Sequence, residues 1–175
     1  MDSISKVPLG RGKYAIIDAE DMCLISKYKW SYNRNNYATA SIREGVNDYS
    51  TVYMHRLICG LKRGDGLIVD HINGNGLDNR KSNLRICSKT QNQQNQKPRH
   101  TAVSKYKGVG FYKRDLKWRA RVIHNKKDIE LGKFDNEISA ALAYDEAAEK
   151  YHKEFAWLNR NNFVEVEEEY KRRRM

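Results

Sequence analysis

Four polar residues in the middle of the chain have the types and order that phosphodiester hydrolysis requires. Asp70 and His71 are adjacent at the end of an apolar stretch, and Asn83 and Asn92 follow them. A histidine with a near-neutral pKa can take a proton from water. Oxygen atoms of Asp70 and Asn92 can hold a divalent cation that offsets charge on a phosphate. We therefore interpret this segment as a one-metal hydrolytic site acting on DNA, with His71 as the general base.

The oxygen ligands favour magnesium, because two protein oxygens leave most of its coordination positions to phosphate and water. Asn83 is expected to fix the imidazole through its backbone or through the neighbouring loop. Successive side chains on a strand point to opposite faces, so the strand is expected to end or twist at Asp70-His71. Taken singly, these residues could be ordinary turn chemistry, since Asn and Gly are common in turns. Their joint occurrence favours catalysis.

The elements that must position these side chains read as strand, loop, strand and helix. An apolar strand is predicted over 66–69 and a second strand over 84–87. Ser88 and Gln91 fit a capping box, which predicts a helix over 89–95. The preceding segment, 7–60, is β-rich. Its predicted parts are a strand over 14–17, a hairpin over 30–42 that turns at 33–36, and a stretch over 51–58 that begins as strand and ends as short helix.

A set of matching positions resembles the HNH endonucleases of the ββα-metal (His-Me finger) class, and most nearly the phage- and intron-associated homing endonucleases. These positions are Val69-Asp70-His71, Gly74, Asn79, Asn83-Leu84-Arg85 and Asn92, with Met54-His55-Arg56-Leu57 as a similar lead-in. The resemblance covers roughly 50–96. It implies that Asp70 and Asn92 hold Mg²⁺ or Mn²⁺, that His71 is the general base and that Asn83 is structural.

Three further residues near this motif have open interpretations. His55 lies near the active site and touches phosphate, or it is a buried, hydrogen-bonded histidine, which we favour. Arg56 and Arg85 hold the DNA backbone, or they form salt bridges with Asp65 or Asp78.

A second module is predicted from the charge pattern in the last third of the chain. Residues 105–127 contain nine Lys or Arg and one acid, whereas 128–169 contain twelve acids and four bases. Three strands are expected over 108–112, 117–123 and 128–132, followed by a helix over 137–152 with an apolar stripe. Residues alternate between the two faces of the middle strand. Trp118, Ala120 and Val122 would pack on the helix, and Arg119 and Arg121 would face outward.

Several motifs in this module resemble the Apetala/ethylene-response-factor DNA-binding domain, a three-stranded sheet packed on one helix. They are Tyr106-Lys107-Gly108-Val109, Lys117 to Val122, Leu131-Gly132-Lys133-Phe134 and Ala143-Tyr144-Asp145-Glu146-Ala147-Ala148. The resemblance implies a DNA-binding sheet face, where arginine can read guanine. Its expected contacts are Lys113, Arg114, Arg119, Arg121, Lys126 and Lys127. The alternative is a basic, solvated sheet face. Gly110, Phe111 and Tyr112 replace the arginines of the family's first strand, so base specificity cannot be transferred.

The whole chain carries 33 basic and 22 acidic residues, a net charge of +11, which favours nucleic acid as partner. No apolar run approaches the ~20 residues needed to span a bilayer. No membrane partner is expected, and the N-terminus lacks the layout of a secretion signal. We expect a cytoplasmic location in a bacterial or phage-infected cell. The three cysteines form no C-x-x-C pattern, so a structural zinc site is not expected.

These observations predict an α+β protein with a small N-terminal sheet leading into a ββα-metal core, then a three-stranded antiparallel sheet on one helix. The expected divisions are a nuclease domain over 1–96, a linker over 97–104, a DNA-binding domain over 105–160 and a charged tail over 161–175. The predicted function is a metal-dependent, site-specific endonuclease of the homing type acting on double-stranded DNA. Cutting both strands would need a homodimer or a second event. The alternatives are a DNA-binding transcriptional regulator with an inactive nuclease fold, and a structure-specific or RNA-directed nuclease.

Overall fold

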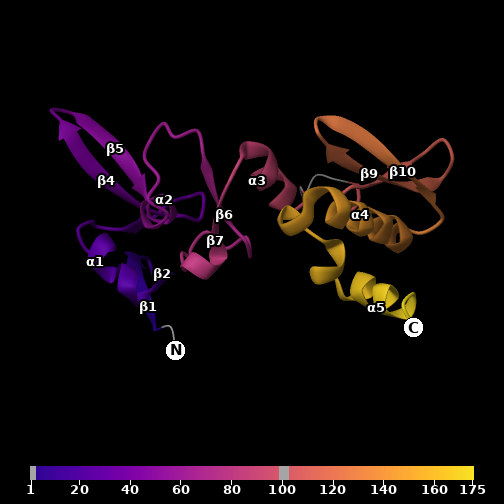
Figure 1. Ribbon diagram of the computed structural model, residues 1–175, viewed down its shortest axis with the longest axis horizontal. Helices are drawn as coiled ribbons and strands as arrows, with labels where there is room; N and C mark the ends of the chain where they lie inside the picture. The colour runs from indigo at the N-terminus through magenta and orange to yellow at the C-terminus, as the bar shows by residue number, and fades with distance from the viewer. Residues whose placement is uncertain (1–2, 99–102) are drawn as a thin grey trace. The chain divides into compact units, whose positions relative to one another are not determined.

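A computed structural model describes residues 3–98 and 103–175 of the chain (Figure 1). The chain forms two compact units, Met1–Asn92 and Gln93–Met175. Both combine small antiparallel sheets with helices, so the predicted α+β class is confirmed. The predicted linker, 97–104, lies partly outside the described residues. Within the described part of the chain, no helix is long and apolar enough to cross a membrane.

The first unit begins with two small antiparallel sheets. A hairpin of two strands, β1 (Ile4–Gly10) and β2 (Lys13–Asp18), is followed by a three-stranded sheet of β3 (Ser31–Tyr32), β4 (Ala38–Gly45) and β5 (Asp48–Tyr53). Short helices connect them: η1 (Ala19–Asp21), α1 (Met22–Ile25) and α2 (Met54–Ile58). The predicted hairpin over 30–42 and the change from strand to helix within 51–58 are confirmed. Alternate apolar side chains of both sheets, with Met54 from α2, form the core.

The ββα segment of the first unit follows. It consists of β6 (Ile68–His71), the 3-10 helix η2 (Lys81–Asn83), β7 (Leu84–Cys87) and α3 (Lys89–Asn95). The two strands pair antiparallel, with Asp70 opposite Arg85 and His71 opposite Leu84. The strand begins at Ile68 rather than at the predicted residue 66, because Gly66 adopts a left-handed φ of 69° that a strand does not contain. The predicted bounds of the helix over 89–95 are confirmed.

The second unit is a three-stranded sheet in the order β10-β9-β8 with a long helix beside it. Its elements are β8 (Val109–Tyr112), β9 (Lys117–His124), β10 (Lys127–Phe134), α4 (Glu137–His152), η3 (Lys153–Phe155), η4 (Asn159–Asn161) and α5 (Val164–Arg172). Asn136 caps α4 by accepting a hydrogen bond from the Ser139 amide at 2.7 Å. Ala120 and Val122 are buried, as the alternation along the middle strand predicts. Arg121 is exposed on the opposite face.

The C-terminal segment, expected as a charged tail, contains the packed helix α5. Val166 of α5 is fully buried, and it belongs to the same core cluster as Tyr106 and Leu142. Phe163 and Tyr170 pack against that cluster from either side of Val166 in the sequence. Their spacing of three and four residues places all three on one helix face. The many charged residues around them hid this apolar face from composition-based reasoning.

Candidate functional site

The Asp70 carboxylate lies in the pairing between β6 and β7. Its Oδ2 accepts hydrogen bonds from Arg85 Nη2 at 2.7 Å and from Arg85 Nε at 2.9 Å. Both side chains are largely buried, with 7% of the aspartate and 15% of the arginine side chain exposed. The sequence led us to pair Arg85 with Asp65 or Asp78, or with DNA, whereas the strand register pairs it with Asp70. The guanidinium of Arg85 therefore binds Oδ2 of the Asp70 carboxylate.

His71 is the last residue of β6, and its imidazole is buried. Its Nε2 lies 3.2 Å from Oδ1 of Asn79. A carbonyl oxygen only accepts hydrogen bonds, so this contact favours the tautomer that carries its proton on Nε2. Burial lowers the pKa of His71, and the hydrogen bond to Asn79 and the charges of Asp70 and Asp78 oppose that shift in part. The imidazole is therefore neutral near pH 7, as a general base must be.

Asn83 holds the loop that follows His71. Its Nδ2 donates to the Asp78 carbonyl at 2.7 Å and to Asn73 Oδ1 at 3.1 Å, and its Oδ1 accepts from the Asn73 amide at 3.0 Å. Its backbone carbonyl accepts from the Ile72 amide. We expected Asn83 to act through the histidine backbone or through the neighbouring loop. These hydrogen bonds join Asn83 to the loop. Asp78 pairs with Arg80 in the same loop.

Asn92 lies in α3, whose start is built by the predicted capping box. The Ser88 amide donates to Gln91 Oε1 at 2.9 Å, and the Gln91 amide donates to Ser88 Oγ at 3.3 Å. Residues 3–98 and 103–175 contain no group of three or more His, Cys, Asp or Glu side chains that could hold a metal ion. The donors that the motif offers are thus a carboxylate oxygen of Asp70 and an amide oxygen of Asn92. Hard oxygen donors in small number fit Mg²⁺ or Mn²⁺ by their chemistry.

We considered two positions for His55, near the active site or buried in the fold. His55 is both buried and close to His71. The two imidazole centroids are 5.1 Å apart, with their planes at 81°. The Nδ1 atom of His55 is buried and has no hydrogen-bond partner in the described part of the chain. Burial lowers the pKa of His55 to about 3, and the charges of His71 and Arg56 add to the shift. The expected hydrogen bond is therefore missing at this atom.

Two residues near His71 were not assigned any role by sequence reasoning. Asn79, a position of the motif, holds the imidazole at Nε2. Tyr37 precedes β4, and its ring centroid is 5.8 Å from that of His71. Burial raises the pKa of Tyr37, and the negative charge of Asp70 raises it further. The tyrosine lies far upstream of the motif, so spacing alone offered no signal for it.

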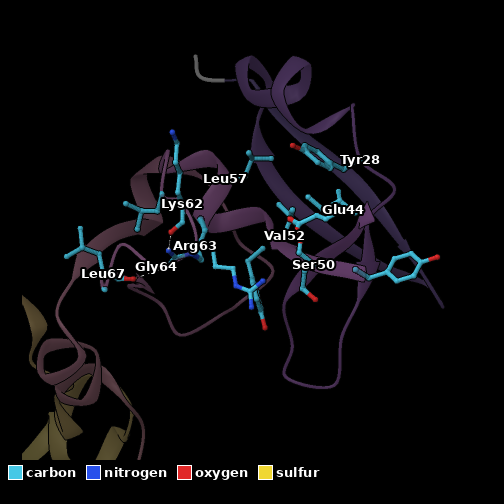
Figure 2. A pocket seen from close by; sticks show the side chains of 16 residues that line it. Tyr28, Glu44, Ser50, Val52, Leu57, Lys62, Arg63, Gly64 and Leu67 are labelled. Atoms are coloured by element: carbon cyan, nitrogen blue, oxygen red, sulfur yellow. Dashed lines mark hydrogen bonds between the residues drawn. The ribbon is translucent and has the colours of Figure 1, made fainter. Parts of the chain in front are cut away.

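Arg56 holds a loop of the first unit. Its Nη1 donates to the Leu67 carbonyl at 2.7 Å and its Nη2 to the Lys62 carbonyl at 2.5 Å. This loop and the β4–β5 hairpin flank an open groove of about 780 Å³ (Figure 2). Tyr49 and Tyr53 lie on the hairpin side, and Lys62 and Arg63 on the loop side. Arg56 thus contacts backbone within its own unit, in place of the salt bridge that we considered.

The outward face of the second unit's sheet differs from the unbroken positive surface that the sequence suggested. Arg121 pairs with Asp128 at 2.9 Å, and Arg119 lies 3.8 Å from Glu130, both across the β9–β10 pairing. Arg114 pairs with Asp115. Acidic residues of β10 that follow the basic segment in the sequence lie beside the arginines of β9 in the folded hairpin. The three expected lysine contacts are exposed: Lys113 and Lys126 lie in the turns, and Lys127 is the first residue of β10.

Comparison with known proteins identifies relatives of the first unit and of most of the chain. A family model described as HNH endonuclease matches residues 52–94. An uncharacterised HNH endonuclease of Acanthamoeba polyphaga mimivirus is 32% identical over 161 residues, which cover 89% of this chain and 80% of the relative. No solved structure matches the chain significantly.

Shorter matches fall on plant proteins. APETALA2-like protein 2 of Oryza sativa is 41% identical over 58 residues, 33% of this chain and 13% of the plant protein. An AP2-like ethylene-responsive transcription factor of Arabidopsis thaliana is 44% identical over 48 residues, 27% of this chain and 10% of the plant protein. These matches concern a small part of each plant protein, so they indicate a shared module at most.

Proposed function

The chain belongs to the HNH endonuclease family, and we propose that it is a metal-dependent, site-specific DNA endonuclease of the homing type whose chemistry is centred on Asp70 and His71. A DNA-cleaving hydrolase is what the family and the mimivirus relative support. The observation that carries the detailed proposal is the buried, neutral His71 next to the Asp70 carboxylate on β6.

In this proposal His71 Nδ1 takes a proton from the water that attacks the phosphorus atom, and the bond from phosphorus to the leaving sugar oxygen breaks. Asn79 keeps the imidazole in the tautomer that leaves Nδ1 able to accept. Asn83 holds the loop that follows the base. Asp70 and Asn92 would hold Mg²⁺ or Mn²⁺, which when bound supplies positive charge to the phosphate and leaving oxygens. The guanidinium of Arg85 would contact the phosphate after separating from the Asp70 carboxylate.

The second unit is proposed to bind double-stranded DNA as an Apetala/ethylene-response-factor-like domain. Its support is the short similarity to plant proteins, one of which is named a transcription factor, together with the arginines on the outward face of β9. Exposed ion pairs contribute little to stability, so phosphates can displace Asp128 and Glu130 from Arg121 and Arg119 at small cost. One active site cuts one strand, and cutting both strands would need a homodimer or a second encounter.

The alternative is a DNA-binding regulator with an inactive nuclease fold. The pairing of Arg85 with Asp70 favours it, because a permanent ion pair would keep the carboxylate from a cation.

Two variants separate these functions. We expect Asp70→Asn and Asn92→Ala to abolish cutting of a DNA fragment that carries the gene's own flanking sequence, while the affinity for that fragment stays unchanged. Gel-shift titration and cleavage in Mg²⁺ measure the two properties on the same samples. Wild-type protein that binds the fragment tightly but leaves it intact would favour the regulator.

A further inference from the structure

Aromatic rings from three separate segments meet around His71. Tyr37 comes from the turn before β4, and His55 is the second residue of α2. The centroid of His71 is 5.1 Å from that of His55 and 5.8 Å from that of Tyr37, and the latter two are 5.1 Å apart. These distances lie in the range at which aromatic rings pack, roughly 4.5–7 Å. The imidazole therefore has ring contacts from two residues in addition to Asn79 at Nε2.

The burial of His55 is not explained by hydrogen bonding. Only 7% of the His55 surface is exposed, and its Nδ1 atom has no hydrogen-bond partner among the described residues. An unsatisfied buried polar atom destabilises the folded state, so such a group calls for a compensating role. The contacts that His55 makes are with rings: Tyr37, His71 and Tyr53, the last at 5.5 Å. Ring packing beside His71 is thus the role that its surroundings indicate.

The loop after His71 fixes Tyr37 from the other side. A Cβ atom at Gly76 would lie 2.3 Å from the Asn36 carbonyl oxygen and 2.8 Å from Cδ1 of Tyr37. The backbone of the Asn-Gly loop therefore lies directly on the tyrosine. Asn33 Oδ1 accepts a hydrogen bond from the Tyr37 amide at 3.0 Å, which fixes the turn that presents the ring. The side chain of Tyr37 is therefore one of the contacts between the turn before β4 and the loop that follows His71.

We infer that Tyr37 and His55 are positioning residues, whose rings hold the His71 imidazole in the orientation that proton transfer needs. The inference rests on the proposed role of His71 as general base. It makes the N-terminal sheet a part of the active site, since Tyr37 lies outside the residues 52–94 that the family model matches. An imidazole without these contacts can rotate about its side-chain bonds. Misplacement of a reacting group by about 1 Å can lower the rate roughly 100-fold.

The test compares variants that remove a ring with variants that keep one. Tyr37→Leu and His55→Leu remove the ring contact, whereas Tyr37→Phe and His55→Phe preserve it. Tyr49→Leu is the matched control, because this tyrosine is 63% exposed on β5 of the same sheet. Steady-state nicking of plasmid carrying the gene's flanking DNA measures kcat and KM, and gel shift measures DNA affinity. Nitrogen-detected NMR of the histidine rings reports the environment of His71 directly.

We expect both leucine variants to lower kcat by about 10- to 100-fold with KM and DNA affinity unchanged. The phenylalanine variants and the Tyr49 control should retain the wild-type kcat. If Tyr37→Leu fails to fold, Tyr37→Met fills similar space without a ring and should show the same loss. Leucine variants with full kcat would overturn the inference, and so would phenylalanine variants that fail to restore it.

A His71→Ala variant in the same series separates this inference from the proposed function. Full activity without His71 would reject the general base itself. An inactive His71→Ala beside a fully active Tyr37→Leu would keep the base and reject only the positioning role.

Discussion

His71 owes its proposed chemistry to burial and to the hydrogen bond at Nε2, which together leave a neutral ring with its lone pair on Nδ1. The residue types and their order in the chain were sufficient to select Asp70, His71, Asn83 and Asn92 as candidates. The same reasoning could not find the partner of Arg85, because that pairing depends on the register of two strands. It could not find Tyr37 either, since its contact with His71 arises only when the N-terminal turn packs on the catalytic loop.

The lowered pKa of His71 predicts how kcat for DNA cleavage falls at low pH, which is the acid limb of the pH profile. The neutral base is present above the folded-state pKa and is lost as the pH falls through it. Because burial places this pKa below the ordinary histidine value of 6.5, the midpoint of the fall in kcat at saturating Mg²⁺ should lie below pH 6.5. Asn79→Ala removes a hydrogen bond that raises the pKa, so its acid limb should move lower still. A limb centred above pH 6.5 would show that another group controls the rate.

At the scale of elements, local signals predicted the boundaries best where a specific side chain defines them. Ser88 and Gln91 marked the start of α3, and the alternation along β9 identified its buried face. The strand β1 and the packed helix α5 were missed. The first has few apolar residues, and the second has three apolar contacts dispersed among charges. In both cases the tertiary contacts, which local propensity does not contain, stabilise the element.

The capping box of α3 yields a prediction about this helix, which carries Asn92. Ser88→Ala removes the hydroxyl that accepts from the Gln91 amide, a loss of about 1 kcal/mol in helix stability. Amide hydrogens of α3 should then exchange roughly fivefold faster, as that free energy implies. Native-state hydrogen exchange measures this locally, and Ser88→Thr should keep the wild-type rates. Equal exchange in Ser88→Ala and wild type would mean that packing alone holds the helix.

At the scale of the molecule, the net charge of +11 and the division into two units agree with the proposal that a separate module brings the nuclease to its DNA. The division of charge along the sequence suggested one basic and one acidic region. The fold instead places acids of β10 beside bases of β9. Charge counts along a chain ignore strand pairing, which explains this difference.

The proposed DNA interface of the second unit can be tested by its salt dependence. Each phosphate contact contributes about 0.9 to the slope of log affinity against log salt concentration. Arg119→Ala combined with Arg121→Ala should therefore weaken binding and reduce the slope by about 2. Asp128→Asn combined with Glu130→Gln is the control, because it frees the same arginines and should not reduce the slope. An unchanged slope in the arginine variant would exclude this face from the interface.

The most direct test of the central claim is nicking of a supercoiled plasmid that carries the gene's own flanking DNA. If His71 is the general base of a metal-dependent nuclease, we expect nicked plasmid with Mg²⁺ or Mn²⁺. We expect no nicking with EDTA, and none with His71→Ala at equal DNA occupancy. Nicking that survives in His71→Ala, or that persists without any divalent cation, would contradict it.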